Sequence, residues 1–206
     1  MEILKKTFIT AFFILLVIRL SAQTNDVLQK AFHSSYTNEL NKNYTAAIND
    51  ISPYLSDNNY EVTIRLGWLY YLNKNYTASQ SYYQKAINIK PGSIEAKFGY
   101  VKPLSFLQNW DKVLEQYMAI LKIDPQNTQA NYWAGVIFYN RKQYETAIKL
   151  FKVGVSLYPF DYDFNHMLAW SSLMAGKKQM PNPLFERALI IKPTDASSTD
   201  GLNRCN

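Results

Sequence analysis

The sequence predicts an all-α protein, a solenoid of about five antiparallel helix pairs. The main observation is that four prolines, Pro91, Pro125, Pro159 and Pro193, stand 34 residues apart in one register. A fixed period of this length indicates identical supersecondary units in a row, because each unit buries its apolar face only against its neighbours. The second observation is that small and aromatic residues recur at fixed places within each period.

The first 22 residues have the features of a secretory signal peptide. Two lysines precede an apolar run over residues 8–18, and Ser21 and Ala22 supply small residues before Gln23. This run is too short to span a bilayer, which needs roughly 20 apolar residues. We therefore expect cleavage between Ala22 and Gln23 and a periplasmic or secreted protein in a bacterium. A membrane anchor formed by an uncleaved N-terminal segment is the alternative.

The mature chain, residues 23–206, is predicted to be one repeat domain in which each unit is a helix, a short turn and a second helix. The units cover about residues 28–59, 60–93, 94–127, 128–161 and 162–195, followed by a short C-terminal tail over residues 196–206. Proline cannot continue the second helix of a unit but is tolerated just beyond its end. The first unit is two residues short, because the octamer that begins at Leu40 is nearly repeated 32 residues later.

Asn-Tyr-Thr occurs in both copies of this octamer, at residues 43–45 and 75–77. The tripeptide matches an N-glycosylation acceptor. Both copies fall at the corner between the two helices of a unit, where asparagine suits turn geometry. We therefore interpret these asparagines as turn residues.

The recurring small and aromatic residues resemble a known repeat family. With units that start at residues 60, 94, 128 and 162, position 8 holds Gly67, Val101, Gly135 and Ala169, and position 24 holds Tyr83, Tyr117, Phe151 and Phe185. Together with proline at position 32, this pattern resembles the tetratricopeptide-repeat family over roughly residues 26–193. The resemblance implies a right-handed α-solenoid that binds other proteins.

Two places depart from the pattern. Pro103 falls inside the first helix of the third unit, and we expect a bend near Gly99–Pro103 because proline removes one backbone hydrogen bond. Pro181, Asn182 and Pro183 predict a late start for the second helix of the last unit, with Asn182 as its N-cap and Pro183 in its first turn.

Composition and motifs argue against several classes of function. Without residues 1–22 the chain has 19 basic and 15 acidic residues, a net charge of about +4, with no basic run that would indicate a nucleic-acid partner. Cys205 is the only cysteine, so no internal disulfide can form, and an intermolecular one stays open. His33 and His166 lie far apart, and no metal-ligand, phosphate-loop or nucleophile motif occurs. We predict no enzyme activity, cofactor or metal site; a Ser/His/Asp arrangement that converges only in space stays open.

The resemblance places the binding surface on the first helix of each unit, which in this family lines the concave side of the solenoid. The predicted partner-binding residues are Trp68, Tyr71, Phe98, Lys102, Tyr132, Tyr139, His166 and Trp170. Aromatic rings supply a large contact area at low entropic cost, so such a face suits an extended peptide or an apolar helix. The alternative is that each ring packs between helices as part of the core.

These features predict a non-enzymatic protein-interaction module, a scaffold or assembly factor of the bacterial cell envelope that binds a peptide or protein segment in the concave groove. The alternative is a module that binds a glycan or small ligand on the concave aromatic residues. Ile64 and Trp68 occupy two positions where some family members hold a clamp for a peptide carboxylate, which argues against that clamp. No integral membrane segment is expected after signal removal. The short tail after Pro193 leaves self-association through the C-terminal end open.

Overall fold

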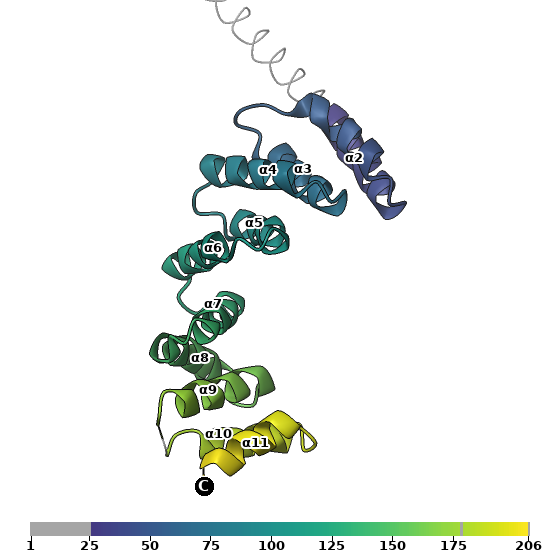
Figure 1. Ribbon diagram of the computed structural model, residues 1–206. Helices are drawn as coiled ribbons and strands as arrows, with labels where there is room; N and C mark the ends of the chain where they lie inside the picture. Colours follow the sequence, from purple (N-terminus) through teal and green to yellow (C-terminus); the bar gives the residue numbers. More distant parts are fainter. Residues whose placement is uncertain (1–25, 178, 206) are drawn as a thin grey trace, which may run out of the picture. The chain divides into compact units, whose positions relative to one another are not determined.

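The computed structural model describes residues 26–177 and 179–205, which fold into two compact units, residues 26–91 and 92–205 (Figure 1). Helices are the only regular secondary structure in these residues, and this confirms the predicted all-α fold of packed helix pairs. The expected signal peptide and its cleavage site lie outside the described residues.

The first unit consists of short helices around an aliphatic core. Its elements are a helix over residues 26–40, α2 (Tyr44–Ile51), the 3-10 helix η1 (Ser52–Tyr54), α3 (Tyr60–Leu72) and α4 (Tyr76–Ile89). α2 packs against α3, and α3 packs against α4. The core contains Ala47, Ile48, Ile51, Val62, Leu66 and Leu69.

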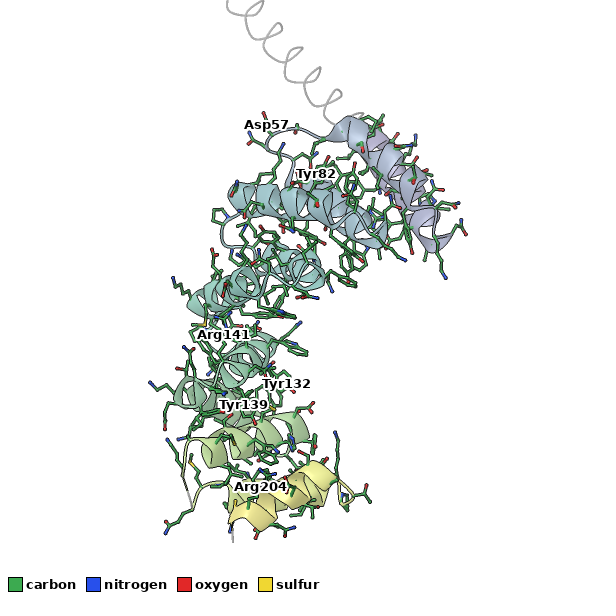
Figure 2. All side chains as sticks on the ribbon, in the orientation of Figure 1. Asp57, Tyr82, Tyr132, Tyr139, Arg141 and Arg204 are labelled. Atoms are coloured by element: carbon green, nitrogen blue, oxygen red, sulfur yellow. The ribbon has the colours of Figure 1, made fainter. Side chains whose placement is uncertain are left out.

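The second unit is a row of seven helices within the described residues. They are α5 (Ile94–Phe106), α6 (Trp110–Ile123), α7 (Thr128–Asn140), α8 (Tyr144–Leu157), α9 (Tyr162–Met174), α10 (Asn182–Ile191) and α11 (Ala196–Cys205). Each helix packs against the next one in the chain, and Figure 2 shows the side chains between them. Three rings dominate the main core cluster, Phe151, Phe164 and Phe185.

The 34-residue period determines where the first helix of each repeat begins. α3, α5, α7, α9 and α11 begin at residues 60, 94, 128, 162 and 196. The side chain before each of them accepts a hydrogen bond from a backbone N–H of the first turn; these residues are Asn59, Ser93, Asn127, Asp161 and Asp195. Each cap contributes about 1 kcal/mol. The C-terminal tail predicted over residues 196–206 therefore begins as one further first helix.

The corner inside each repeat also recurs, and it explains the repeated octamer. Lys74 has a φ of 59° and donates its N–H to the carbonyl of Tyr71 at 3.0 Å, while Asn75 N–H reaches the carbonyl of Tyr70 at 2.9 Å. This is a Schellman motif, which satisfies carbonyl groups at the end of a helix. Lys42, Gln108, Lys142 and Gly176 occupy the same place with positive φ. Asn75 is also the N-cap of α4 and accepts the N–H of Ala78, which agrees with the turn interpretation.

Small residues allow close contact with rings, as the spacing predicted. Gly67 lies against the ring of Tyr83, and Gly135 lies against the ring of Phe151. A methyl group at residue 135 would come within 2.7 Å of that ring, so only glycine fits without a shift of the neighbour. Positions 8 and 24 therefore contact each other in both units.

A buried amide at position 4 of the repeat was not anticipated from the sequence. The side-chain NH2 of Asn165 donates to the carbonyls of Pro159 and Asp161, at 3.0 and 2.6 Å. Asn131, 34 residues earlier, forms the equivalent two bonds at 2.9 Å each. Both side chains are almost fully buried. They connect the carbonyl of the proline turn to the first turn of the next helix, where the same asparagines also donate their backbone N–H to the carbonyls of Asn127 and Asp161.

The two irregular places have different outcomes. α5 continues as a helix through the buried Pro103, and the expected bend stays a prediction. α8 begins at residue 144, so the period would start α10 at residue 178; it begins at Asn182, four residues later, as expected. The predicted cap was wrong, because Pro181 is the N-cap residue and Asn182 is already helical. Pro181 has φ and ψ of −76° and −29°, which leads directly into the helix.

Candidate functional site

Two predicted residues, Trp68 and Tyr71, form an aromatic pair on α3 in the first unit. Their rings stack with centroids 5.6 Å apart and planes 27° apart. Tyr71 also contacts the ring of Tyr76 on α4, at 5.9 Å. All three rings are half-buried. They therefore keep an accessible face while their positions are restricted by contact with one another.

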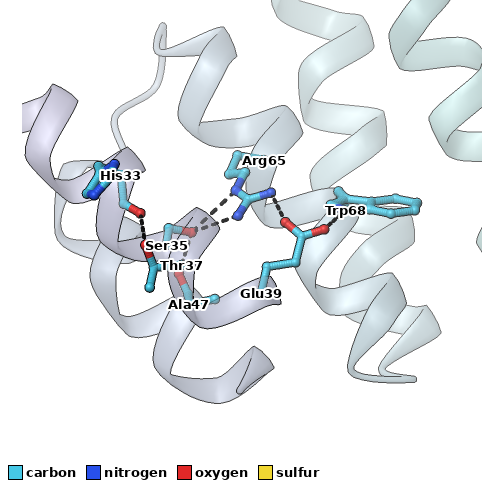
Figure 3. A network of polar contacts seen from close by, with 7 residues as sticks. All are labelled: His33, Ser35, Thr37, Glu39, Ala47, Arg65 and Trp68. Carbon is cyan, nitrogen blue, oxygen red and sulfur yellow. Dashed lines mark hydrogen bonds and ion pairs between the residues drawn. The ribbon is translucent and has the colours of Figure 1, made fainter. Parts of the chain in front are cut away.

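A buried polar network orients Trp68 (Figure 3). The indole N–H donates to Glu39 Oε1 at 2.7 Å, and the other oxygen of Glu39 pairs with the guanidinium of Arg65. Arg65 also donates to Ser35 Oγ at 3.1 and 3.3 Å. Ser35 in turn donates to the carbonyl of Ala47 at 2.9 Å. The network joins the helix over residues 26–40 to α2 and α3.

The burial of this network determines its energetics. Arg65 is only 6% exposed and Ser35 is fully buried. A buried guanidinium needs a charged partner and satisfied donors, because an unpaired buried charge is strongly destabilising. Glu39 supplies that charge and also orients the indole. Glu39 and Arg65 were not among the residues predicted from the sequence, although an arginine in the middle of an otherwise apolar helix is a signal for a buried charge pair.

In the second unit, α5 carries the predicted residues Phe98 and Lys102. Phe98 is half-buried and meets the ring of Tyr117 on α6 edge to face, at 6.3 Å. Burial raises the pKa of Tyr117 to about 12. Lys102 is exposed on the same helix. Phe98 therefore takes part in packing between α5 and α6, whereas Lys102 faces solvent.

Tyr132 and Tyr139 on α7 lie partly in the core (Figure 2). The ring of Tyr132 meets Phe151 at 6.0 Å and Phe164 at 5.5 Å, both edge to face. Tyr139 meets the ring of Tyr144 at 5.5 Å. Burial raises the pKa of both predicted tyrosines. For Tyr132 the interpretation as a core ring, left open by the sequence, has strong support from these contacts.

The last two predicted residues, His166 and Trp170, lie beneath the start of α11. His166 Nδ1 is 2.9 Å from Ser198 Oγ, and the indole N–H of Trp170 donates to Ser197 Oγ at 3.1 Å. Trp170 also packs edge to face on Phe185, with centroids 5.3 Å apart. Both predicted side chains are half-buried. The C-terminal segment, expected to be a short tail, covers part of the surface that the resemblance assigned to binding.

The same region brings a serine, a histidine and an aspartate together. Asp195 Oδ2 lies 3.6 Å from His166 Nδ1, and Ser197 Oγ lies 3.4 Å from His166 Nε2. The Ser197 contact is longer than a usual hydrogen bond between a hydroxyl and its base, whereas Ser198 Oγ lies 2.9 Å from His166 Nδ1. Asp195 Oδ2 accepts the backbone N–H of Ser198 at 2.7 Å as a helix cap. These contacts attach α11 to α9 through polar side chains.

Within residues 26–177 and 179–205, no group of three His, Cys, Asp or Glu side chains is placed to hold a metal ion. In the same residues, no helix combines the length and apolar character needed to cross a membrane.

Comparisons with known proteins identify the repeat and the fold. Two family models described as tetratricopeptide repeats match, one over residues 60–93 and the other over residues 107–162. The chain is similar to a solved tetratricopeptide repeat protein from Parabacteroides merdae, with a TM-score of 0.73 and 16% identity over 87% of this chain and 72% of that chain. The comparison with curated proteins gave no match.

Two further solved structures are similar over almost their whole length. The MamA protein has a TM-score of 0.70 and 14% identity, with 84% of this chain and 95% of that chain covered. YrrB, whose description is a TPR protein with an unusual peptide-binding site, has a TM-score of 0.70 and 11% identity over 90% of this chain and 97% of that chain. Identities this low show a shared fold and leave the binding residues of this chain to be argued from its own contacts.

Proposed function

Because this chain belongs to the tetratricopeptide-repeat family, we propose that it is a non-enzymatic scaffold or assembly factor of the bacterial cell envelope. It binds a peptide or protein segment on the aromatic faces of its first helices. The coarse function, a protein-interaction module, is what this repeat fold supports. The envelope location rests on the expected signal peptide, and the intact mass of protein from the native host tests its removal.

The observation that carries the binding surface is the fixed but accessible pair Trp68 and Tyr71. The carboxylate of Glu39 holds the indole of Trp68, and the ring of Tyr71 stacks on it. A side chain that is already ordered loses little conformational entropy when a partner binds. Tryptophan and tyrosine are also the residues that most often dominate binding energy at interfaces. The α3 face is therefore prepared to receive a partner.

The test is capture of a partner from envelope extract by immobilised mature protein, with identification by mass spectrometry and a titration of the purified partner. Replacement of Trp68 by Ala should weaken that binding by about 1–3 kcal/mol, the range for truncation of a hot-spot ring. Tyr158→Ala is the matched control, because Tyr158 is an exposed ring at the C-cap of α8 and does not belong to α3. It should bind as tightly as the parent protein.

Two results would count against the α3 face. A Trp68→Ala protein that keeps its circular dichroism and binds the partner at full strength places the site elsewhere. A Trp68→Ala protein that loses its helical signal identifies the ring as a structural residue of the first unit.

A further inference from the structure

A pocket of about 750 Å³ opens in the second unit beside α6 and α7. It lies outside the residues that the sequence analysis singled out for binding. Its volume falls within the range of ligand-binding pockets, roughly 300–1,000 Å³, and is larger than one side chain requires. The pocket can therefore receive more than one side chain of a bound segment.

The pocket is apolar at its base and has two tryptophans at its opening. Val113 and Tyr117 of α6 are buried in its wall. Trp110 and Trp133 also line it and are 50% and 46% exposed. The ring of Trp133 is restricted by an edge contact with Tyr132 at 5.2 Å. Large rings exposed around an apolar hollow indicate an interaction site more often than a solvated surface.

One end of the pocket is polar and basic. Arg141, at the end of α7 (Figure 2), lines the pocket and pairs with Asp111 at 2.6 Å. Asp111 is 90% exposed, and exposed pairs of this kind are weak, so the guanidinium can exchange its partner for a bound carboxylate. Lys112 and Lys142 are the exposed chain neighbours of this pair. Arg141 is the charged side chain among the residues that line the pocket, and its positive charge favours an acidic occupant.

We propose that this pocket binds an extended segment of a partner protein that carries a large apolar side chain next to an aspartate or glutamate. The apolar side chain enters beside Trp110 and Trp133, and the carboxylate pairs with Arg141. The assignment rests on the proposed protein-binding function and deepens it, because it specifies the chemistry of the partner. It also adds a second binding position, separate from Trp68 on α3.

The mature protein labelled with 5-fluorotryptophan tests this assignment. The chain contains four tryptophans, Trp68, Trp110, Trp133 and Trp170, so fluorine NMR gives one resonance for each, assigned with single Trp→Phe variants. The probe is the capped octapeptide Gly-Ser-Phe-Asp-Phe-Asp-Ser-Gly, titrated to millimolar concentration. The matched peptides replace both aspartates by lysine or both phenylalanines by serine.

The expected result is a saturable shift of the Trp110 and Trp133 resonances with the Phe-Asp peptide and little shift with either matched peptide. Arg141→Gln should weaken the affinity for the Phe-Asp peptide by about tenfold. This corresponds to the loss of one charge-assisted hydrogen bond of about 1.4 kcal/mol. Lys152→Gln, which removes one positive charge from the exposed face of α8, should leave the affinity unchanged.

Four results would overturn the assignment. Equal shifts with the Phe-Lys peptide would show that the peptide's negative charge does not contribute to binding. Unchanged affinity of the Arg141→Gln protein for the Phe-Asp peptide would show that Arg141 does not bind the carboxylate. Shifts confined to Trp68 or Trp170 would move the peptide to the first-helix faces and leave the proposed function intact. If no resonance shifts, the pocket assignment fails, and capture of a partner by the α3 face still decides the proposed function separately.

Discussion

The first and second units differ in what lies between their helices. In the first unit, the guanidinium of Arg65 is buried between helices and is neutralised by Glu39. In the second unit, phenylalanine rings dominate the core, and Phe151 lies against Gly135 as Tyr83 lies against Gly67 in the first unit. A buried charge is stabilised only while its partner is present, whereas a ring is stabilised by the volume it fills. The repeat period therefore constrains the backbone and leaves the chemistry of each interface free to differ.

Removal of a ring from the second unit should have the largest effect. Phe151 is fully buried and contacts Tyr132, Phe164 and Gly135. Phe151→Ala should lower the free energy of unfolding by about 3–5 kcal/mol, because it removes apolar contacts and leaves a cavity. Urea denaturation followed by circular dichroism measures this loss. Tyr158→Ala, at an exposed ring, should change it by less than about 0.5 kcal/mol. A loss below about 1 kcal/mol for Phe151→Ala would show that the ring interface tolerates a cavity.

Removal of the charge from the first unit should have an intermediate effect. Arg65→Met leaves the carboxylate of Glu39 without its cation, and we expect a loss of about 2–3 kcal/mol, below the range for fully buried pairs because the Glu39 side chain is 21% exposed. The double variant Arg65→Met, Glu39→Leu removes both charges and should be less destabilised than Arg65→Met alone. A double-mutant cycle measures this coupling. If the losses in unfolding free energy of the single variants Arg65→Met and Glu39→Leu add up to that of the double variant, the ion pair does not determine the stability of the unit.

A change of pH should have the smallest effect and should act on the second unit. Burial lowers the pKa of His166 below its ordinary value of 6.5, against the opposing effect of Asp195. The folded protein then favours neutral histidine, and the unfolded chain takes up protons first as the pH falls. Stability is fully present above pH 6.5 and decreases as the pH falls toward the lower pKa of the folded state.

Denaturation curves at about pH 7.5 and 5.5 compare the parent protein with His166→Gln on this point. The glutamine variant keeps a polar partner for Ser198 and should lose less stability between the two conditions. The same pH dependence in both proteins would show that the contact between α9 and α11 does not depend on the charge of His166.

Much of the fold could be predicted because it depends on residues at regular spacing. The starts of α3, α5, α7 and α9 follow from the proline period, and the contact of Gly135 with Phe151 follows from their positions within one unit. The late start of α10 followed from two prolines. The cap of α10 was predicted one residue too late, since sequence pattern locates a helix boundary only approximately.

The candidate sites were less predictable because they depend on residues without a common spacing. Glu39 and Trp68 are 29 residues apart and occupy unrelated places in their repeats. Trp110 and Trp133 line one pocket although one begins a second helix and the other lies inside a first helix. The resemblance located candidate rings on the first helices. It gave no indication that α11 would contact His166 and Trp170.

The sequence alone determined the class of the fold, the period of the helices and the small residues that allow them to pack. These features repeat, and each copy indicates the same helix-pair structure. Only the tertiary structure decided which rings are held with an accessible face, which charge is buried and where an open pocket remains. These properties arise from contacts between side chains that occur once in the chain. A single contact of that kind leaves no periodic signal, and its energy depends on burial and geometry that no local pattern records.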